Sequence, residues 1–144
     1  MSYRFTTSLP YLLNRVGVKM GEMFLAHLSQ YELTLPMYRV LAVLKQEGKQ
    51  SLGDLSDMVS VELSTLSRLI TTMKNRGLVS RVRLEDNARM VHIDLTAQGE
   101  LLVEKLMPIA AQFEEVGTAC FSPQELEWLK DALIKMEQRF EQLK

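Results

Sequence analysis

The polar residues that follow Val61 are of the types that form hydrogen bonds with nucleic acids. Hydroxyl and amide groups reach phosphates and base edges without bulk, and an arginine can pair with guanine through two hydrogen bonds. No acidic residue occurs between positions 63 and 84 to repel a phosphate. We therefore expect a DNA-contacting face, and the plainer alternative is a solvated helix that lacks acids by chance. The candidate contacts are Ser64, Thr65, Ser67, Arg68, Thr71, Thr72 and Asn75.

A helix is needed to bring these side chains onto one side. At about 100° per residue, one stripe of the helix is apolar and predicts its buried face; it comprises Leu66, Leu69, Ile70 and Met73. The opposite side carries Ser64, Arg68, Thr71 and Asn75, with Ser67 and Thr72 at its flanks. We expect this helix to begin near Val61 and to end before Gly77, because glycine takes the left-handed conformation that closes a helix.

Two strand-like segments follow, 78–83 and 90–95, and turn-forming residues separate them. The second segment alternates apolar and polar residues, so the pair predicts a β-hairpin. Arginines on such a hairpin can enter the minor groove beside a recognition helix, because narrow A·T-rich grooves attract guanidinium groups. An ordinary exposed turn with scattered cations is the alternative. The candidates here are Arg81, Arg83 and Arg89.

Two helices are predicted before the polar helix and the hairpin that follows it. Apolar residues at helical spacing indicate a long amphipathic helix over 9–28. Pro36 fits the first turn of a second helix, after Thr34 or Leu35, and this helix stops at Gly48.

Capping patterns place the remaining helices. Ser51, which we also count among the DNA-contact candidates, opens a short helix that runs to about position 59. Thr96 caps a long helix that runs to about position 117, in which Pro108 predicts a kink. Ser122 starts a capping box that opens a last helix over 123–143. A short helix, a tight turn, a second helix and a hairpin follow one another in the order of a winged helix-turn-helix.

Composition fits one globular domain and hides a charge asymmetry. The 144 residues are 47% hydrophobic and 24% charged, with a net charge of −1. Residues 64–90 hold six bases and two acids, whereas residues 98–144 hold nine acids and five bases, so a basic middle adjoins an acidic end. No apolar run is long enough to span a membrane and no signal peptide is evident. With a single cysteine, we expect a cytoplasmic protein.

Four stretches of the chain resemble the MarR family of bacterial transcription regulators. The longest is SLGDLSDMVSVELSTLSRLITTMKNRGLVSR, and it is followed by NARMVHIDLTAQGE. LTLPMYRVLAVL precedes them, and the last helix opens with FSPQEL. The resemblance covers nearly the whole chain, and its most specific parts are STLSRLI, RGLV and the LT-x-x-G pattern after the hairpin. It implies a mainly α fold with a small β-hairpin wing, in which a winged helix-turn-helix is flanked by N- and C-terminal dimerisation helices.

The resemblance also implies an organisation and a role. A single domain over 1–144 would consist of a DNA-binding lobe over 33–96 and dimerisation helices over 1–32 and 97–144. A homodimer would bind a pseudo-palindromic operator and act as a repressor. A small aromatic or phenolic ligand would release it from the DNA. The resemblance implies neither a membrane partner nor a cofactor. The wing-tip arginine would be Arg89, although the family's usual aspartate two residues earlier is Asn87 here, beside Asp86. The competing interpretation is a dimeric protein-interaction module whose winged helix no longer binds DNA.

Amphipathicity supports the dimer independently. The helices predicted over 9–28, 97–117 and 123–143 are long and lie outside a compact winged-helix core. Their apolar faces need a partner, and a twofold-related copy would place two recognition helices about one turn of DNA apart.

A ligand site is expected where the dimerisation helices meet the lobe. Arg15 or Arg39 would hold an aromatic acid, or its thioester, among methionine and tyrosine side chains. The alternative is that the methionines and tyrosines fill the core and both arginines are surface residues. The candidates are Tyr11, Arg15, Met23, His27, Met37, Tyr38 and Arg39.

Nothing in the sequence favours an enzyme, a metal site or a cofactor. His27 and His92 are far apart, no cysteine or histidine has metal-ligand spacing, and no glycine-rich phosphate loop occurs. Cys120 lies between the last two predicted helices without a basic neighbour to stabilise a thiolate, so we expect it to be inert. Peroxide-sensing members of the family carry their reactive cysteine in the first helix, where this chain has none.

Overall fold

The computed structural model describes residues 2–84 and 87–144, with residues 84 and 87–90 described through their backbone alone. Within these ranges the chain forms six α-helices and a three-stranded sheet, which confirms the predicted fold class. Short 3₁₀ helices over Phe5–Thr7 and Ser29–Tyr31 were not predicted. The main elements are α1 (Leu9–Leu28), α2 (Leu35–Glu47), β1 (Gln50–Ser51), α3 (Leu52–Val59), α4 (Leu63–Asn75), β2 (Val79–Leu84), β3 (Asn87–Leu95), α5 (Ala97–Gly117) and α6 (Pro123–Gln142).

Side-chain caps determine where several helices begin. The Thr34 hydroxyl accepts the Met37 N–H at 3.3 Å and opens α2. In the capping box of α6, the Ser122 hydroxyl accepts the Glu125 N–H at 3.1 Å, and the Glu125 carboxylate accepts the Ser122 N–H at 2.9 Å. The sequence predicted the start of α6, because capping depends on residues that are adjacent along the chain; for α2 it left Thr34 or Leu35, and the structure has Thr34 as the cap.

Helix α4 begins later than predicted, at Leu63 rather than near Val61. Ser60 takes a left-handed conformation with φ of 55°, and the Val61 N–H donates to the Ser56 carbonyl at 3.1 Å. The turn after α3 therefore uses residues 60–62, and Glu62 becomes the residue that precedes the helix.

The hydrophobic core lies mainly between α2, α3 and α4. Leu41 of α2, Leu55 of α3 and Ile70 of α4 are fully buried. The predicted stripe of α4 is confirmed, since Leu66 and Met73 are also fully buried and Leu69 packs against the core. Other buried residues of this core are Leu28 of α1 and Val103 and Leu106 of α5.

The predicted hairpin is part of a larger antiparallel sheet with the strand order β1-β3-β2. In β1, Gln50 lies opposite Ile93 and Ser51 lies opposite His92. The sequence did not predict β1, because two residues are too short to show alternation. It is extended only through its pairing with β3.

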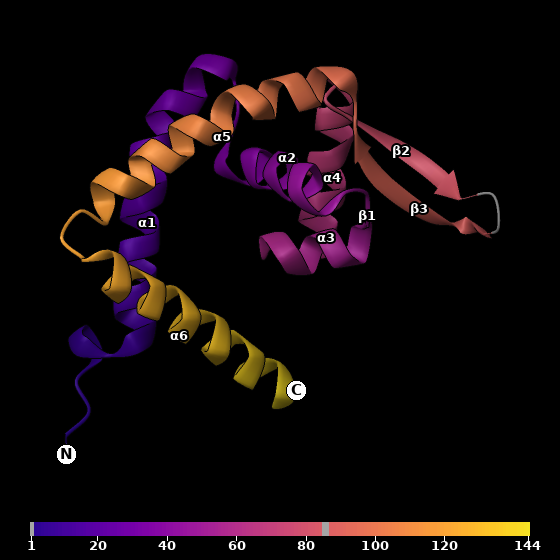
Figure 1. Cartoon of the computed structure of the whole chain (residues 1–144). Coiled ribbons are helices and arrows are strands. Elements are labelled where there is room, and N and C mark those ends of the chain that lie inside the picture. The colour runs from indigo at the N-terminus through magenta and orange to yellow at the C-terminus, as the bar shows by residue number, and fades with distance from the viewer. Residues whose placement is uncertain (1, 85–86) are drawn as a thin grey trace.

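The elements form a lobe and a set of long helices, as Figure 1 shows. Helices α2, α3 and α4 and the base of the sheet form the lobe, from which β2 and β3 project as a wing. Helix α5 leads back from the wing toward α1, and α6 leaves the far end of α5. An ion pair of 3.1 Å between Glu114 and Lys130 joins α5 to α6. None of the described helices is both long and apolar enough to cross a bilayer.

Thr96 alone connects β3 to α5. Its hydroxyl donates to the Gly77 carbonyl at 2.6 Å and accepts the Gly99 N–H at 3.0 Å. A β-carbon at Gly99 would lie 2.0 Å from the Leu78 carbonyl oxygen, so only glycine permits this approach. The LT-x-x-G pattern therefore fixes the start of α5 against the turn that follows α4.

Candidate DNA interface and ligand cavity

The outer face of α4 is open to solvent. Ser64, Arg68, Thr71 and Asn75 are exposed, opposite the buried stripe, as their spacing predicted. Among the described residues the side chain of Arg68 forms no hydrogen bond or ion pair, so its guanidinium keeps all its donors for an external partner. The flanking candidates are the exposed Thr65 and Thr72 and the half-buried Ser67.

Several hydroxyls on this face donate within the protein. Thr71 donates to the Ser67 carbonyl at 3.1 Å, and Thr72 donates to the Arg68 carbonyl at 3.2 Å. Ser64 donates to the carboxylate of Glu62 at 2.8 Å. Because each hydroxyl has a single hydrogen, these three groups can only accept from a further partner while these bonds persist.

Arg81 connects the wing to α4. Its Nη2 donates to the hydroxyl oxygen of Thr71 at 3.0 Å. Arg83 is two residues further along β2, so both exposed arginines lie on the same side of the strand. The side chains of Arg89 and Asn87 are not among those that the structure describes. The role of Arg89 at the wing tip therefore stays a prediction.

Ser51 has a structural role that the sequence predicted. Its hydroxyl accepts the Asp54 N–H at 3.1 Å and caps α3. The hydroxyl hydrogen is not used in this cap, so Ser51 could still donate to a phosphate.

Arg76 was not among the sequence candidates, yet it fixes the end of α4. Its Nη1 donates to the Glu32 carbonyl at 2.6 Å and its Nη2 donates to the Tyr31 carbonyl at 2.9 Å. Glu32 takes a left-handed conformation with φ of 55°, and Gly77 closes α4 with φ of 74°, the latter as predicted. The pairing of Arg76 depends on tertiary structure, so no local sequence signal could have revealed it.

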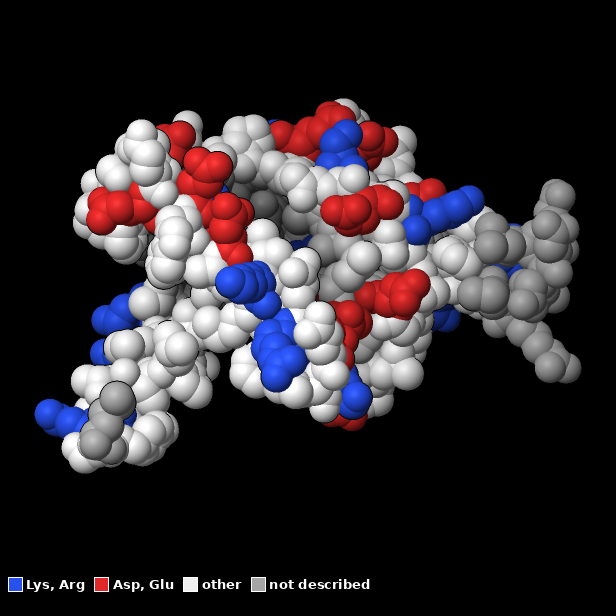
Figure 2. All heavy atoms as spheres, turned by 60° about the horizontal axis from the view of Figure 1, so that its bottom comes forward, with Lys and Arg blue, Asp and Glu red and all other residues white. Residues whose placement is uncertain are grey.

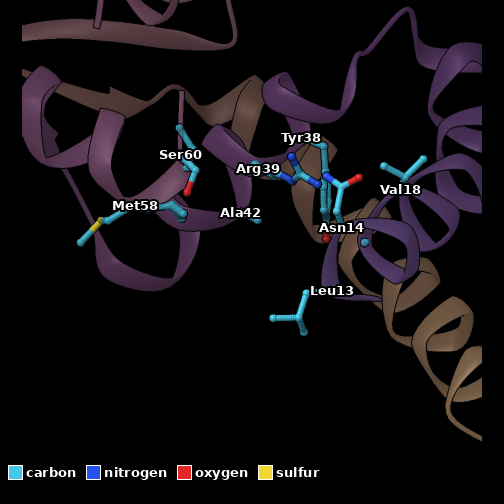
Figure 3. Close-up of a pocket in the computed structure, with 11 residues that line it drawn as sticks. Leu13, Asn14, Val18, Tyr38, Arg39, Ala42, Met58 and Ser60 are labelled. Atoms are coloured by element: carbon cyan, nitrogen blue, oxygen red, sulfur yellow. The ribbon is translucent and has the colours of Figure 1, made fainter. Parts of the chain in front are cut away.

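Two cavities flank Tyr38 and Arg39 of α2. The larger, which we call the α3-side cavity, has a volume of about 830 Å³ and lies between α1, α2 and the end of α3. Figure 3 shows Arg39 and Tyr38 grouped with Asn14 of α1 in this cavity, while Met58 and Ser60 line its far side.

The smaller cavity, the α5-side cavity, has a volume of about 440 Å³ and lies between α1, α2 and α5. Its walls are largely apolar, with one cation and one carboxylate; they include Met23, Phe24, Tyr38, Arg39, Phe113 and Glu114. The Phe24 ring packs edge-on against the rings of Tyr38 and Phe113, with centroid distances of 4.7 and 5.8 Å. Burial raises the pKa of the Tyr38 hydroxyl above the ordinary value of 10.0, at which a tyrosine is already protonated at neutral pH, so the hydroxyl can donate to a ligand.

The structure brings Met23, Tyr38 and Arg39 together and separates them from the other ligand candidates. Arg15 stacks over the Tyr11 ring at 5.6 Å, and neither residue lines either cavity. Met37 and His27 do not line the α5-side cavity either: Met37 is buried in the core, and His27 stacks on Phe24, which does line it. Within the described residues, Nε2 of His27 is buried without a hydrogen-bond partner.

A salt bridge links α2 of the lobe to α5. Lys45 Nζ lies 2.8 Å from the Glu100 carboxylate and 2.9 Å from that of Glu104. The hydrogen bonds that Lys45 Nζ donates to these two carboxylates raise the pKa of Lys45. The paired charges hold α2 against the first turns of α5.

Comparisons with known proteins agree with this arrangement. The model of the MarR family matches residues 33–91. The organic hydroperoxide resistance transcriptional regulator of Bacillus subtilis is 27% identical over 133 residues, which cover 92% of this chain and 89% of that protein.

Solved structures share the fold. Bordetella bronchiseptica BpsR, described with a mechanism for regulation of its DNA binding by 6-hydroxynicotinic acid, superposes with a TM-score of 0.83 and 26% identity. This similarity covers 95% of this chain and 98% of BpsR. A mutant MarR from E.coli complexed with operator DNA has a TM-score of 0.79 and 23% identity, over 94% of this chain and 99% of that one. Residues 33–91 thus match the MarR family, and over nearly its whole length the chain is similar to transcriptional regulators, among them a DNA-binding protein of the same fold.

Proposed function

We propose that two copies of the chain form a homodimer that binds a pseudo-palindromic operator and acts as a repressor released by a small aromatic acid, its thioester or a phenol. In this proposal residues 33–96 form the DNA-binding lobe, and residues 1–32 and 97–144 form the dimerisation helices of a single domain. Because its target is DNA, the protein would work in the cytoplasm. The observation that carries the proposal is the exposed, acid-free outer face of α4.

The DNA contacts follow from that face. Arg68 is exposed and has no partner within the described residues, so it can donate two hydrogen bonds to a guanine. Arg81 lies against α4, and Arg83 is exposed on the same side of β2; both are of a type suited to phosphates or to the minor groove. The proposed contacts are Ser51, Ser64, Thr65, Ser67, Arg68, Thr71, Thr72, Asn75, Arg81, Arg83 and Arg89.

The dimer is inferred from apolar side chains that the described chain leaves uncovered. No described residue of α6 is buried, and Trp128 and Phe140 are 71% and 63% exposed. On α1, Leu9 and Val16 are 56% and 55% exposed. In Figure 2 broad uncharged areas separate the charged side chains on one face, including the surface next to the N-terminus. Apolar surface of this extent marks an interaction site, and a second copy would bury it.

The effector is inferred from the α5-side cavity. Its methionine and phenylalanine walls suit an aromatic ring, and Arg39 and the protonated hydroxyl of Tyr38 suit a carboxylate or a phenol. Of the two arginines considered from the sequence, Arg39 is favoured because Arg15 stacks on Tyr11 elsewhere on α1. The 6-hydroxynicotinic acid that regulates BpsR is an aromatic acid of this kind.

Salt dependence tests the DNA-binding proposal. A duplex that the protein enriches from a randomised pool serves as the operator, and its affinity is measured between 50 and 200 mM salt, a range over which several phosphate contacts weaken binding steeply. The log of the association constant should fall by about 0.9 per phosphate contact for each unit of log salt. A failure to enrich any duplex would favour the protein-interaction module instead.

Displacement tests the effector proposal. Aromatic acids, phenols and their thioesters are screened for a rise in melting temperature and for release of the selected duplex. Arg39→Met should abolish the response to a carboxylate, whereas the matched control Arg15→Met should retain it. Equal loss in both variants would contradict the placement of the ligand beside Arg39.

A further inference from the structure

The hydroxyl group of Thr71 both donates and accepts a hydrogen bond within the protein. Its hydrogen is donated to the Ser67 carbonyl at 3.1 Å, and its oxygen accepts from Arg81 Nη2 at 3.0 Å. These two bonds come from different elements, the preceding turn of α4 and strand β2. They hold the oxygen of this exposed side chain against the protein.

The methyl group of Thr71 takes part in neither bond. The hydroxyl can no longer donate to a base and keeps one acceptor lone pair, so the methyl adds an apolar surface to a residue type that predicts a polar contact. In the major groove an apolar surface has one distinctive partner, because thymine alone among the four bases carries a C5 methyl group there.

We propose that the Thr71 methyl recognises the C5 methyl of one thymine in each operator half-site, with Arg81 as the residue that positions it. This inference rests on the proposed function, in which the outer face of α4 enters the major groove. Arg68, one turn earlier on the same face, supplies hydrogen bonds to a neighbouring base pair.

Arg81 acts through Thr71 and not on the base itself. Its bond to the threonine oxygen fixes the rotamer of Thr71, which sets the direction of the methyl group. The remaining N–H groups of this guanidinium can still donate to a phosphate. Loss of Arg81 should therefore have two separable effects: weaker binding to every duplex and weaker discrimination at one base pair.

The test replaces thymine by deoxyuridine, which lacks only the methyl group. Each thymine of the selected operator is replaced in turn, symmetrically in both half-sites. For the wild-type protein we expect one position at which the replacement weakens binding about fourfold per half-site, the effect of losing one buried methyl group. Thr71→Ser should bind the thymine duplex correspondingly less well and should not distinguish it from the deoxyuridine duplex.

Three variants complete the design. Thr72→Ser is the matched control, since Thr72 is also exposed and also donates to a backbone carbonyl, but accepts no bond from Arg81. At the position assigned to Thr71 it should keep the wild-type ratio of thymine to deoxyuridine affinity, although Thr72 is itself a proposed DNA contact and its overall affinity is not the quantity compared. Arg81→Met should reduce the ratio of thymine to deoxyuridine affinity, and Arg81→Lys, which keeps a donor, should restore part of it.

The outcomes separate the two proposals. If a duplex is selected but no deoxyuridine replacement weakens binding, the methyl contact is refuted while DNA binding stands. The methyl contact is refuted in the same way if Thr71→Ser keeps the full discrimination between the two duplexes. If no duplex is selected at all, the proposed function fails and this inference fails with it.

Discussion

Arg76, at the end of helix α4, donates to the carbonyl oxygen of Glu32, in the connection between α1 and α2, at 2.6 Å. The two residues are 44 positions apart, and the second N–H branch of the same guanidinium reaches the Tyr31 carbonyl at 2.9 Å. This one arginine therefore ties the end of α4 to the connection between α1 and α2.

Removal of this arginine should destabilise the protein. Arg76→Met loses two charge-assisted hydrogen bonds to carbonyls, so we expect the free energy of unfolding to fall by about 1–3 kcal/mol. Urea denaturation followed by circular dichroism measures it. Arg68→Met, on the same helix but without a partner among the described residues, is the control and should change stability by less than about 0.5 kcal/mol. Equal effects would show that the contact to Glu32 contributes nothing.

Gly99→Ala should be severely destabilising. The new β-carbon would lie 2.0 Å from the Leu78 carbonyl oxygen, a backbone atom that cannot move aside without displacing the start of α5. We expect a loss of at least about 3 kcal/mol, visible as low soluble yield or a greatly lowered melting temperature.

Gly53→Ala is the contrasting variant, since nothing lies within 4 Å of its β-carbon position in α3. It should stabilise the protein by about 0.4–1 kcal/mol. A well-folded Gly99→Ala protein would mean that the approach of α5 to Leu78 is not as close as described.

The Lys45 salt bridge should contribute to stability only below strongly alkaline pH. Hydrogen bonds with Glu100 and Glu104 raise the pKa of Lys45 above the ordinary value of 10.5, so the folded state binds this proton more tightly than the unfolded state. The stabilisation is thus complete below the unfolded pKa and disappears as pH rises through the folded one. The difference in melting temperature between the wild type and Lys45→Met should be constant well below pH 10.5 and should shrink as pH rises above it. Lys49→Met, an exposed lysine on the same lobe, should show no such decrease.

A charge in the exposed apolar face of α6 should separate the dimer. The wild type should sediment with twice the 16.5 kDa mass of one chain, and Trp128→Glu should shift it toward the monomer. Glu137→Lys changes a charge on the opposite side of the helix, about 180° from Trp128 at 100° per residue, and should leave the dimer intact. Sedimentation of both variants as dimers would place the interface elsewhere.

Arg68→Ala should weaken operator binding and relax its specificity. Loss of a two-bond contact to guanine costs about 1–3 kcal/mol at the contacted base pair and little at other positions. Binding of the variant to the selected operator and to each single-base variant measures this. An unchanged affinity would remove Arg68 from the set of base contacts; Arg4→Ala, exposed near the N-terminus, is the control.

The sequence predicted those parts of the fold that depend on neighbours along the chain. The bounds of α1, the caps at Thr96 and Ser122 and the buried stripe through Leu66 and Ile70 are confirmed, because each follows from local spacing. Strand β1 could not be predicted, since it is extended only by its pairing with β3.

The site was only partly predictable for the same reason. The exposure of the α4 face follows from helical periodicity, but the bond from Arg81 to Thr71 joins two elements and depends on how the sheet packs against the helix. On α1, Tyr11 and Met23 are 12 residues apart, about 18 Å along the helix, so one small cavity could not include both.

The single-residue junction at Thr96 has a mechanical consequence. Strand β3 ends at Leu95 and α5 starts at Ala97, and the hydroxyl of Thr96 is bonded to both Gly77 and Gly99. No flexible loop lies between β3 and α5 that could absorb a change in the tilt of α5. A molecule that binds between α5 and α2 and separates them would therefore also rotate the hairpin of β2 and β3. In a symmetric dimer this rotation would change the distance between the two wings.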